Sequence, residues 1–98
     1  MRLLNKEEIE RFIRKHADSK IAFVKWVSHV EEANWTNHSD VKNDFPSVDY
    51  VGNNRYVFNV KGNNYRIIVV LVFVLGMATV KFIGTHADYD KIKDCSKI

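Results

Sequence analysis

The fold of this chain is decided by residues 65–91, which read YRIIVVLVFVLGMATVKFIGTHADYDK. Nine apolar residues follow the Tyr65-Arg66 pair, six of them β-branched, and Gly76 separates them from a second apolar segment. Two such runs on either side of a glycine are typical of an antiparallel hairpin. The first run is apolar at both odd and even positions, so we expect it to lie mid-sheet with both faces covered. Polar residues lie at the ends of the hairpin, and we expect the functional site at that rim.

Length and composition predict one domain covering residues 1–98. The chain has 98 residues, 46% of them hydrophobic and 28% charged, which is typical of a globular protein that folds without disulfide staples. Its formal net charge is +3, but the charge is unevenly spread. Residues 1–50 carry 8 Lys/Arg against 9 Asp/Glu, whereas residues 51–98 carry 7 against 3. The positive second half favours an anionic partner.

Several features bear on where the protein acts. Cys95 is the only cysteine, so it has no partner for an internal disulfide, and an unpaired thiol fits a reducing compartment. No apolar segment precedes Glu7, so a secretory signal peptide is not expected. The apolar residues 67–80 are too few, and are interrupted by glycine, to span a membrane as a helix. We therefore expect a cytoplasmic protein that has no membrane partner.

The first third of the chain predicts an edge strand followed by a helix. Residues 1–4 are short and apolar enough for the strand. Asn5 is expected to cap the helix, with Glu8 completing a capping box, and the helix is expected to end near Ala17. An apolar stripe at helical spacing runs along it and predicts which face is buried.

A second helix is expected to begin at Asp18 or Ser19 and to end near Asn34. It also carries an apolar stripe, so the two helices are predicted to form a hairpin packed on one face of the sheet. In the connector that follows, Asn37 or Ser39 is expected to cap a single helical turn.

From residue 47 onward the pattern has the period of a strand. Residues 49–51 are a short strand candidate, and residues 55–61 alternate before a turn at 62–64 leads into Tyr65. One face of residues 55–61 is apolar and the other is polar and cationic; the two sets are Tyr56, Phe58 and Val60, and Arg55, Asn59 and Lys61. Beyond the long hairpin, Thr85 is expected to cap a short helix over 85–92 with Asp88 at its third position. Residues 93–98 are expected to be frayed.

The residues that can carry chemistry are cationic. The chain has no Gly-rich phosphate loop, no metal-ligand spacing and no nucleophile elbow, so neither a metal nor another cofactor is expected. The remaining set is Arg55, Lys61, Arg66 and Lys81, with His86 and Tyr89 beside it. Such a set suits metal-free cleavage of RNA, in which a 2′-hydroxyl attacks the neighbouring phosphate and cations stabilise the charge that develops. A histidine can act as base or acid near neutral pH, and a tyrosine can stack on a base or transfer a proton. A structural histidine and a solvated cationic face are the alternative interpretation of the same residues.

Two segments, FNVKGNNYRIIV (58–69) and KFIGTHADYDKI (81–92), resemble the HigB-type toxins of bacterial toxin–antitoxin modules, members of the RelE/ParE-like superfamily. The resemblance covers nearly the whole chain. It implies a RelE-like α+β fold: two N-terminal helices packed on a small antiparallel sheet, and a short C-terminal helix. It also implies an mRNA interferase, a metal-independent endoribonuclease that cuts transcripts, usually during translation on the ribosome. The implied partner is a HigA-like helix-turn-helix antitoxin, through which alone the toxin would meet DNA.

The resemblance also implies roles for individual residues. His86 of the GTH motif is expected to be the general acid or base, and Arg66 to stabilise the scissile phosphate. Lys61 and Tyr89 complete the expected catalytic set. RNA contacts are expected from Arg55, Asn59, Lys81 and Thr85. This interpretation requires the turn before Tyr65, Arg66 and the GTH corner to converge around a spot the size of one phosphodiester.

The chain departs from the family pattern, in which the strand after Tyr65-Arg66 and the turn that follows often carry polar or charged residues; here they carry Val70, Val72, Phe73, Val74, Leu75 and Met77. Val70 stands where a lysine is expected, and Lys81 stands where arginine is commoner; arginine and lysine are not interchangeable at a phosphate site. Two further classes of function therefore remain open. One is a non-catalytic binder, either a weakened toxin that only holds its antitoxin or a ParE-like inhibitor of gyrase. The other is a basic domain that binds RNA without cutting it.

Overall fold

A five-stranded sheet forms the centre of the molecule, which a computed structural model describes from Met1 to Ile98. Its strands are β1 (Arg2–Leu4), β2 (Asp49–Gly52), β3 (Arg55–Val60), β4 (Tyr65–Val72) and β5 (Met77–Thr85). The spatial order is β1-β5-β4-β3-β2, so the strand predicted to lie mid-sheet is the central one. β1 pairs with β5 in parallel, and the other pairs are antiparallel. The predicted α+β class and the predicted edge strand are confirmed.

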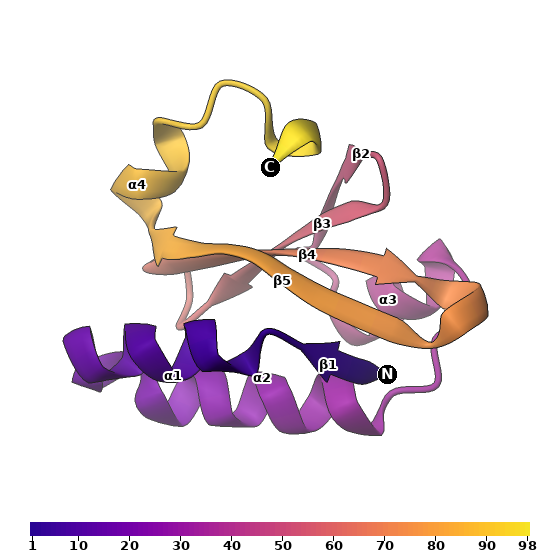
Figure 1. The fold of residues 1–98 in the computed structure, drawn as a ribbon, viewed down its shortest axis with the longest axis horizontal. Coiled ribbons are helices and arrows are strands. Elements are labelled where there is room, and N and C mark those ends of the chain that lie inside the picture. Colours follow the sequence, from indigo (N-terminus) through magenta and orange to yellow (C-terminus); the bar gives the residue numbers. More distant parts are fainter.

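Helices cover the sheet from both sides, as Figure 1 shows. They are α1 (Lys6–Lys15), α2 (Lys20–Glu32), α3 (His38–Asp44) and α4 (His86–Asp90). Three 3-10 turns complete the list: η1 (Ala17–Ser19), η2 (Phe73–Leu75) and η3 (Cys95–Lys97). The helices α1 and α2 run side by side along one face of the sheet, while α4 and the end of the chain lie on the other side.

The face of the sheet toward α1 and α2, called here the helix face, carries the main core. Alternate residues of β4, among them Ile67 and Val69, are fully buried there with Phe23 and Val30 of α2. Truncating a side chain such as Ile67 to alanine costs about 2–5 kcal/mol in cores of this kind. The helices and β4 could be predicted from the sequence because the residues that each contributes to this core are apolar and recur at helical or strand spacing.

The opposite face, called here the second face, carries Arg66, Ile68 and the remaining alternate residues of β4. Ile68 is completely buried and Val57 nearly so, although no long helix lies on this side. The segment after β5 covers it (Figure 1). The prediction that residues 93–98 are frayed is therefore wrong.

Hydrogen bonds hold this last segment to β3 and to the turn before it. Asn53 Nδ2 donates to the main-chain oxygen of Ser96 at 2.9 Å, and Arg55 donates to that of Ile98 through Nε at 3.2 Å and Nη2 at 2.7 Å. No local sequence pattern predicts these contacts, because they join residues 43 positions apart.

The hairpin of β4 and β5 is shorter than predicted. β4 ends at Val72, a 3-10 turn follows, and Gly76 closes it at φ 63°, a left-handed conformation that glycine adopts without strain. Val74 at this tip is 94% exposed. The apolar run therefore extends past the strand into a solvent-exposed tip.

The predicted caps are confirmed in part. Asn37 caps α3, and Thr85 and Asp88 form a complete capping box at α4. Asn5 does not cap α1: it has φ 65°, and its side chain donates to the Val80 carbonyl at 3.2 Å. The pairing of β1 with β5 explains this difference, because it brings the Asn5 amide to a carbonyl on the neighbouring strand. Ser19 also makes no side-chain cap at α2.

Replacing Arg55 with alanine should loosen the last segment without unfolding the sheet. The change removes two hydrogen bonds to Ile98, each of a kind that contributes about 1 kcal/mol net, so amide exchange over residues 94–98 should accelerate roughly 30-fold. Hydrogen exchange read by NMR measures this, with Arg2→Ala on the edge strand as the control. Unchanged exchange would show that Arg55 does not hold the segment.

Candidate active site

Arg66 is the most unusual charged residue of the fold. Its side chain begins on the second face and is only 9% exposed. Nη1 donates to the Asn63 carbonyl at 3.0 Å and to the Tyr65 carbonyl at 3.4 Å, and no carboxylate lies within ion-pair distance. A largely buried cation without a carboxylate is costly, and a guanidinium has further donors that these two bonds do not use. The arrangement favours binding of an anion such as a phosphate.

Tyr89 of α4 lies against this guanidinium. The Arg66 Cζ atom is 5.6 Å from the centre of the Tyr89 ring, within the range of a cation–π contact. Burial, together with a hydrogen bond to Cys95, raises the pKa of Tyr89 to about 12. The phenol therefore keeps its proton at neutral pH. It can donate a hydrogen bond or stack on a base, but it is poorly suited to act as a general base.

His86 is the first residue of α4, and a carboxylate orients its ring. Nδ1 lies 2.8 Å from Oδ2 of Asp90, one helical turn further on. Because a carboxylate only accepts, this hydrogen bond places a proton on Nδ1 and leaves Nε2 to face a substrate. The imidazole is about half exposed, with 49% of its side chain accessible. Asp90 was not predicted as a site residue, although its i,i+4 spacing from His86 was the available signal.

The turn between β3 and β4, residues 61–64, brings these groups together. Arg66 donates to the carbonyl of Asn63, and the His86 amide donates to the carbonyl of Asn64 at 3.1 Å. Lys61 and Gly62 both have positive φ, 55° and 63°, which makes the turn tight. The turn, the start of β4 and the GTH corner therefore meet in the structure, as the sequence interpretation requires.

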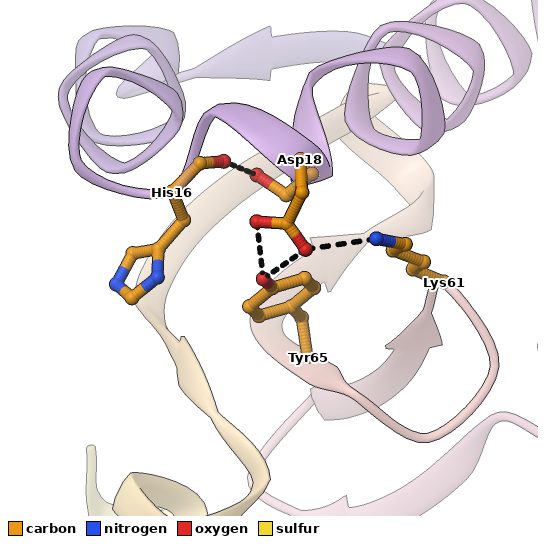
Figure 2. A network of polar contacts seen from close by, with 5 residues as sticks. His16, Asp18, Lys61 and Tyr65 are labelled. Atoms are coloured by element: carbon orange, nitrogen blue, oxygen red, sulfur yellow. Dashed lines mark hydrogen bonds and ion pairs between the residues drawn. The ribbon is translucent and has the colours of Figure 1, made fainter.

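Lys61 is the exception, because its side chain leaves the turn on the helix face. Its Nζ lies 2.8 Å from Oδ2 of Asp18 in η1, and Tyr65 OH donates to the same carboxylate at 2.8 Å (Figure 2). The hydrogen bonds from Lys61 and then Tyr65 hold the pKa of Asp18 below its usual range. The structure thus brings Arg66 to Tyr89 but pairs the Lys61 ammonium with an acid on the other side of the sheet.

The four predicted RNA-contact residues are spread over the sheet. Asn59 pairs directly with Arg66 in register. Arg55 lies four residues earlier on β3, about 13 Å away by strand rise, and its guanidinium is bound to Ile98 and Asn53. Lys81 is exposed at a bulge of β5, and Thr85 serves as the cap of α4. Only Asn59 and Thr85 thus lie next to the groups described above.

Gly84 allows α4 to approach the strand closely, a role the sequence interpretation missed. It is the partner of Arg66 across β4 and β5. A Cβ added there would lie 2.7 Å from Cζ of Phe82 and 3.1 Å from Cβ of Asp88. A side chain at this position would require the Phe82 ring to turn aside and Asp88 of α4 to shift by a few tenths of an ångström.

Metal and membrane features complete the description. The structure contains no group of three or more His, Cys, Asp or Glu residues arranged to hold a metal ion. None of its helices combines the length and the apolar character needed to cross a membrane.

The fold is that of a small RelE-like α+β domain, in which a largely buried arginine of β4 and a histidine of α4 paired with a carboxylate both bond to the turn 61–64. The chain belongs to the HigB toxin family: the family profile, described as the RelE-like toxic component of a toxin–antitoxin system, matches residues 19–92. The partner that this membership implies is an antitoxin.

The chain is similar to curated members over almost its whole length. It is 31% identical over 94 residues to the mRNA interferase HigB of Escherichia coli O6:H1 (strain CFT073), covering 94% of this chain and 91% of that protein. It is 26% identical over 93 residues to the mRNA interferase toxin HigB of Escherichia coli K12, and equally to the mRNA interferase HigB of Shigella flexneri. Those matches cover 92% of this chain and 88% of each relative.

Replacing Gly84 with alanine should destabilise the protein and displace Asp88 of α4 slightly. Overpacking of this kind costs about 1–3 kcal/mol, which lowers the melting temperature by several degrees in a domain of this size. Calorimetry measures the loss, and Phe82→Leu combined with Gly84→Ala should recover part of it because the ring that the new Cβ meets is removed. A melting temperature unchanged by Gly84→Ala would contradict the close approach.

Acid should remove the contribution of Asp18 to folding. The pKa of this carboxyl is lower in the folded protein than in the unfolded chain, so the stability it confers is present above about pH 4 and is lost as pH falls through the folded pKa. The urea midpoint should therefore fall more steeply between pH 5 and 2 in the wild type than in Asp18→Asn. Parallel curves would show that the carboxylate has no such linkage.

Proposed function

We propose that this toxin is an mRNA interferase, a metal-independent endoribonuclease that cuts mRNA by attack of a 2′-hydroxyl on the adjacent phosphate. The observation that carries the proposal is Arg66: a largely buried guanidinium without a carboxylate, close to the corner where His86 begins α4. The names of the relatives, mRNA interferases that match over nearly their full length, support the same activity.

The residues divide the chemistry between charge and proton transfer. Arg66 binds the scissile phosphate, and its fork of donors stabilises the extra negative charge of the transition state. His86 exchanges a proton with the RNA at Nε2, while Asp90 holds Nδ1 and stabilises the ring when it is charged. The 2′-oxygen loses its proton and bonds to phosphorus, and the 5′-oxygen leaves and gains one. The products are a 2′,3′-cyclic phosphate and a 5′-hydroxyl.

Neighbouring side chains hold the RNA around this centre. Tyr89, kept as a phenol, presents its ring to a base or its hydroxyl to a phosphate oxygen. Asn59 lies beside Arg66 and offers an amide to the same nucleotide, and Lys81 adds an exposed charge for the backbone further away. Lys61 contributes through the turn that it begins rather than by touching the phosphate.

Family membership supports an antitoxin partner, and we propose its kind and the substrate as follows. The antitoxin is a HigA-like helix-turn-helix protein, and contact with operator DNA is made through it. The substrate is mRNA, cut in the cytoplasm while ribosomes translate it. An exposed rim site, as opposed to a deep cleft, suits a substrate presented by a larger assembly, since the ribosome can supply the remaining contacts.

Replacing His86 with alanine should abolish cleavage and growth arrest while the protein stays folded and binds its antitoxin. Loss of a general acid or base lowers the rate by about 100- to 10,000-fold. Cleavage of a translated reporter mRNA measures this, and the ends of the products are mapped chemically. His29→Ala is the matched control, because His29 is also half exposed and lies 3.4 Å from a carboxylate, that of Asp44.

The same expression experiment separates the alternative functions. Translation should fall while DNA supercoiling stays normal. The reverse result would indicate a gyrase inhibitor, and normal translation with tight antitoxin binding would indicate a toxin that has lost its activity. Products with 5′-phosphates would reject the 2′-hydroxyl mechanism itself.

Replacing Arg66 with lysine tests the phosphate contact. Lysine keeps one positive charge but loses the planar fork and the bond to Asn63, so cleavage should fall about 100-fold with little change in melting temperature. Full activity in Arg66→Lys would show that this position supplies only charge.

A further inference from the structure

Asp18 receives hydrogen bonds from two residues distant in sequence. Lys61 Nζ donates to Oδ2 at 2.8 Å, and Tyr65 OH lies 2.8 Å from both carboxylate oxygens. Figure 2 shows the carboxylate pointing from η1 toward the sheet, between these two side chains. A residue in the connector of the two long helices therefore reaches the strand side of the molecule.

The backbone that presents Asp18 is fixed by its neighbour. Ser19 is completely buried, and both its amide and its hydroxyl donate to the His16 carbonyl, at 2.9 and 2.6 Å. These bonds stabilise the backbone of η1, from which the Asp18 carboxylate extends.

The two donors to Asp18 stand at the two ends of one turn. Lys61 follows β3 and Tyr65 begins β4, with only residues 62–64 between them. Lys61 also has φ 55°, a conformation that residues other than glycine rarely adopt and that needs support from its surroundings. The Asp18 carboxylate thus binds the residues at both ends of the turn.

The carbonyls of this turn point to the proposed ribonuclease site. Asn63 accepts from Arg66, and Asn64 accepts from the His86 amide. A change in the turn must therefore move the guanidinium and the start of α4 together. The acid on the helix face is linked to the chemistry on the second face by two successive sets of hydrogen bonds.

We propose that Asp18 is a positioning residue of this site: through Lys61 and Tyr65 it sets the turn 61–64, and through the turn it sets Arg66 and His86. The proposal rests on the proposed function, because positioning matters only if these two residues act on RNA. It also reassigns Lys61, whose bound ammonium then serves the turn and not the phosphate. Exposed ion pairs contribute only a small part of the global stability, so we expect Asp18→Asn to change the geometry of the site in addition to its small effect on folding.

The first test needs no activity. Asp18→Asn keeps an acceptor for Tyr65 but loses the charge that holds Lys61, so the turn should open more often. Exchange of the His86 amide, which donates to Asn64, should accelerate about tenfold, as expected for losing a hydrogen bond to a charged group. Glu31→Gln is the matched control, since it breaks the comparably exposed Lys6–Glu31 pair away from the turn and should leave His86 unchanged. Unchanged exchange in Asp18→Asn would overturn the proposal.

The second test is a double-mutant cycle on single-turnover cleavage of mRNA bound to translating ribosomes, which is the substrate of the proposed function. Asp18→Asn and Lys61→Gln should each slow cleavage about tenfold with little change in RNA affinity, and the double variant should be no slower than either alone. Asp18→Glu should recover part of the rate. If Lys61 instead binds the phosphate directly, Lys61→Gln will reduce the cleavage rate far more than Asp18→Asn does. Asp18→Asn would then free the Lys61 ammonium and tighten RNA binding.

The amide-exchange and cleavage experiments distinguish a failure of the proposed function from a failure of the positioning role. A wild-type protein that does not cut RNA defeats the proposed function, while the exchange experiment still decides whether Asp18 controls the turn. Additive losses in the cycle, with normal cleavage by the wild type, defeat the positioning role alone.

Discussion

The burial of β4 on both of its faces is the constraint on which the rest of the structure depends. A strand that is apolar at every position from Ile67 to Val72 must be covered from two sides, and the chain has only two long helices to do it. They cover the helix face, so the segment after β5 must fold back over the second face. That return brings α4 to the start of β4, where Arg66 interrupts the apolar pattern. The candidate site is thus a consequence of how the core is closed.

The turn 61–64 connects the two sides of the sheet. On the helix face it is held by Asp18, and on the second face its carbonyls hold Arg66 and His86. The turn is short and is bonded on both faces of the sheet, with Lys61 held in a left-handed conformation that residues other than glycine rarely adopt. The sequence suggests the same role for Lys61 and Arg66, but the structure separates them. Lys61 is paired with the Asp18 carboxylate, whereas Arg66 has no carboxylate partner and can bind an anion.

The pairing of Lys61 with Asp18, and the absence of a carboxylate beside Arg66, agree with membership of the HigB family, for which a phosphate-binding arginine is expected. The contacts of Arg66 and His86 leave donors of the guanidinium and one ring nitrogen without a partner in the structure, and the raised pKa of Tyr89 disfavours its acting as a general base. The substitution of apolar residues along β4, such as Val70, does not reach the atoms around the turn, because Val70 pairs with Arg55 at the far end of β3. The departures from the family pattern therefore change the sheet more than the proposed site.

The sequence by itself determined the α+β class, the central position of β4, the two-helix layer, the caps of α3 and α4, and the segments that form the site, because each depends on periodicity or on residues a few positions apart. It did not determine where the side chains of the turn point, that Asn5 binds Val80, that Gly84 admits α4, or that residues 92–98 cover the second face. Those contacts join residues tens of positions apart, and only the tertiary structure decides them. Lys61 shows the difference most clearly: strand alternation places it with Arg66, but its left-handed backbone and the carboxylate of Asp18 turn it to the other side.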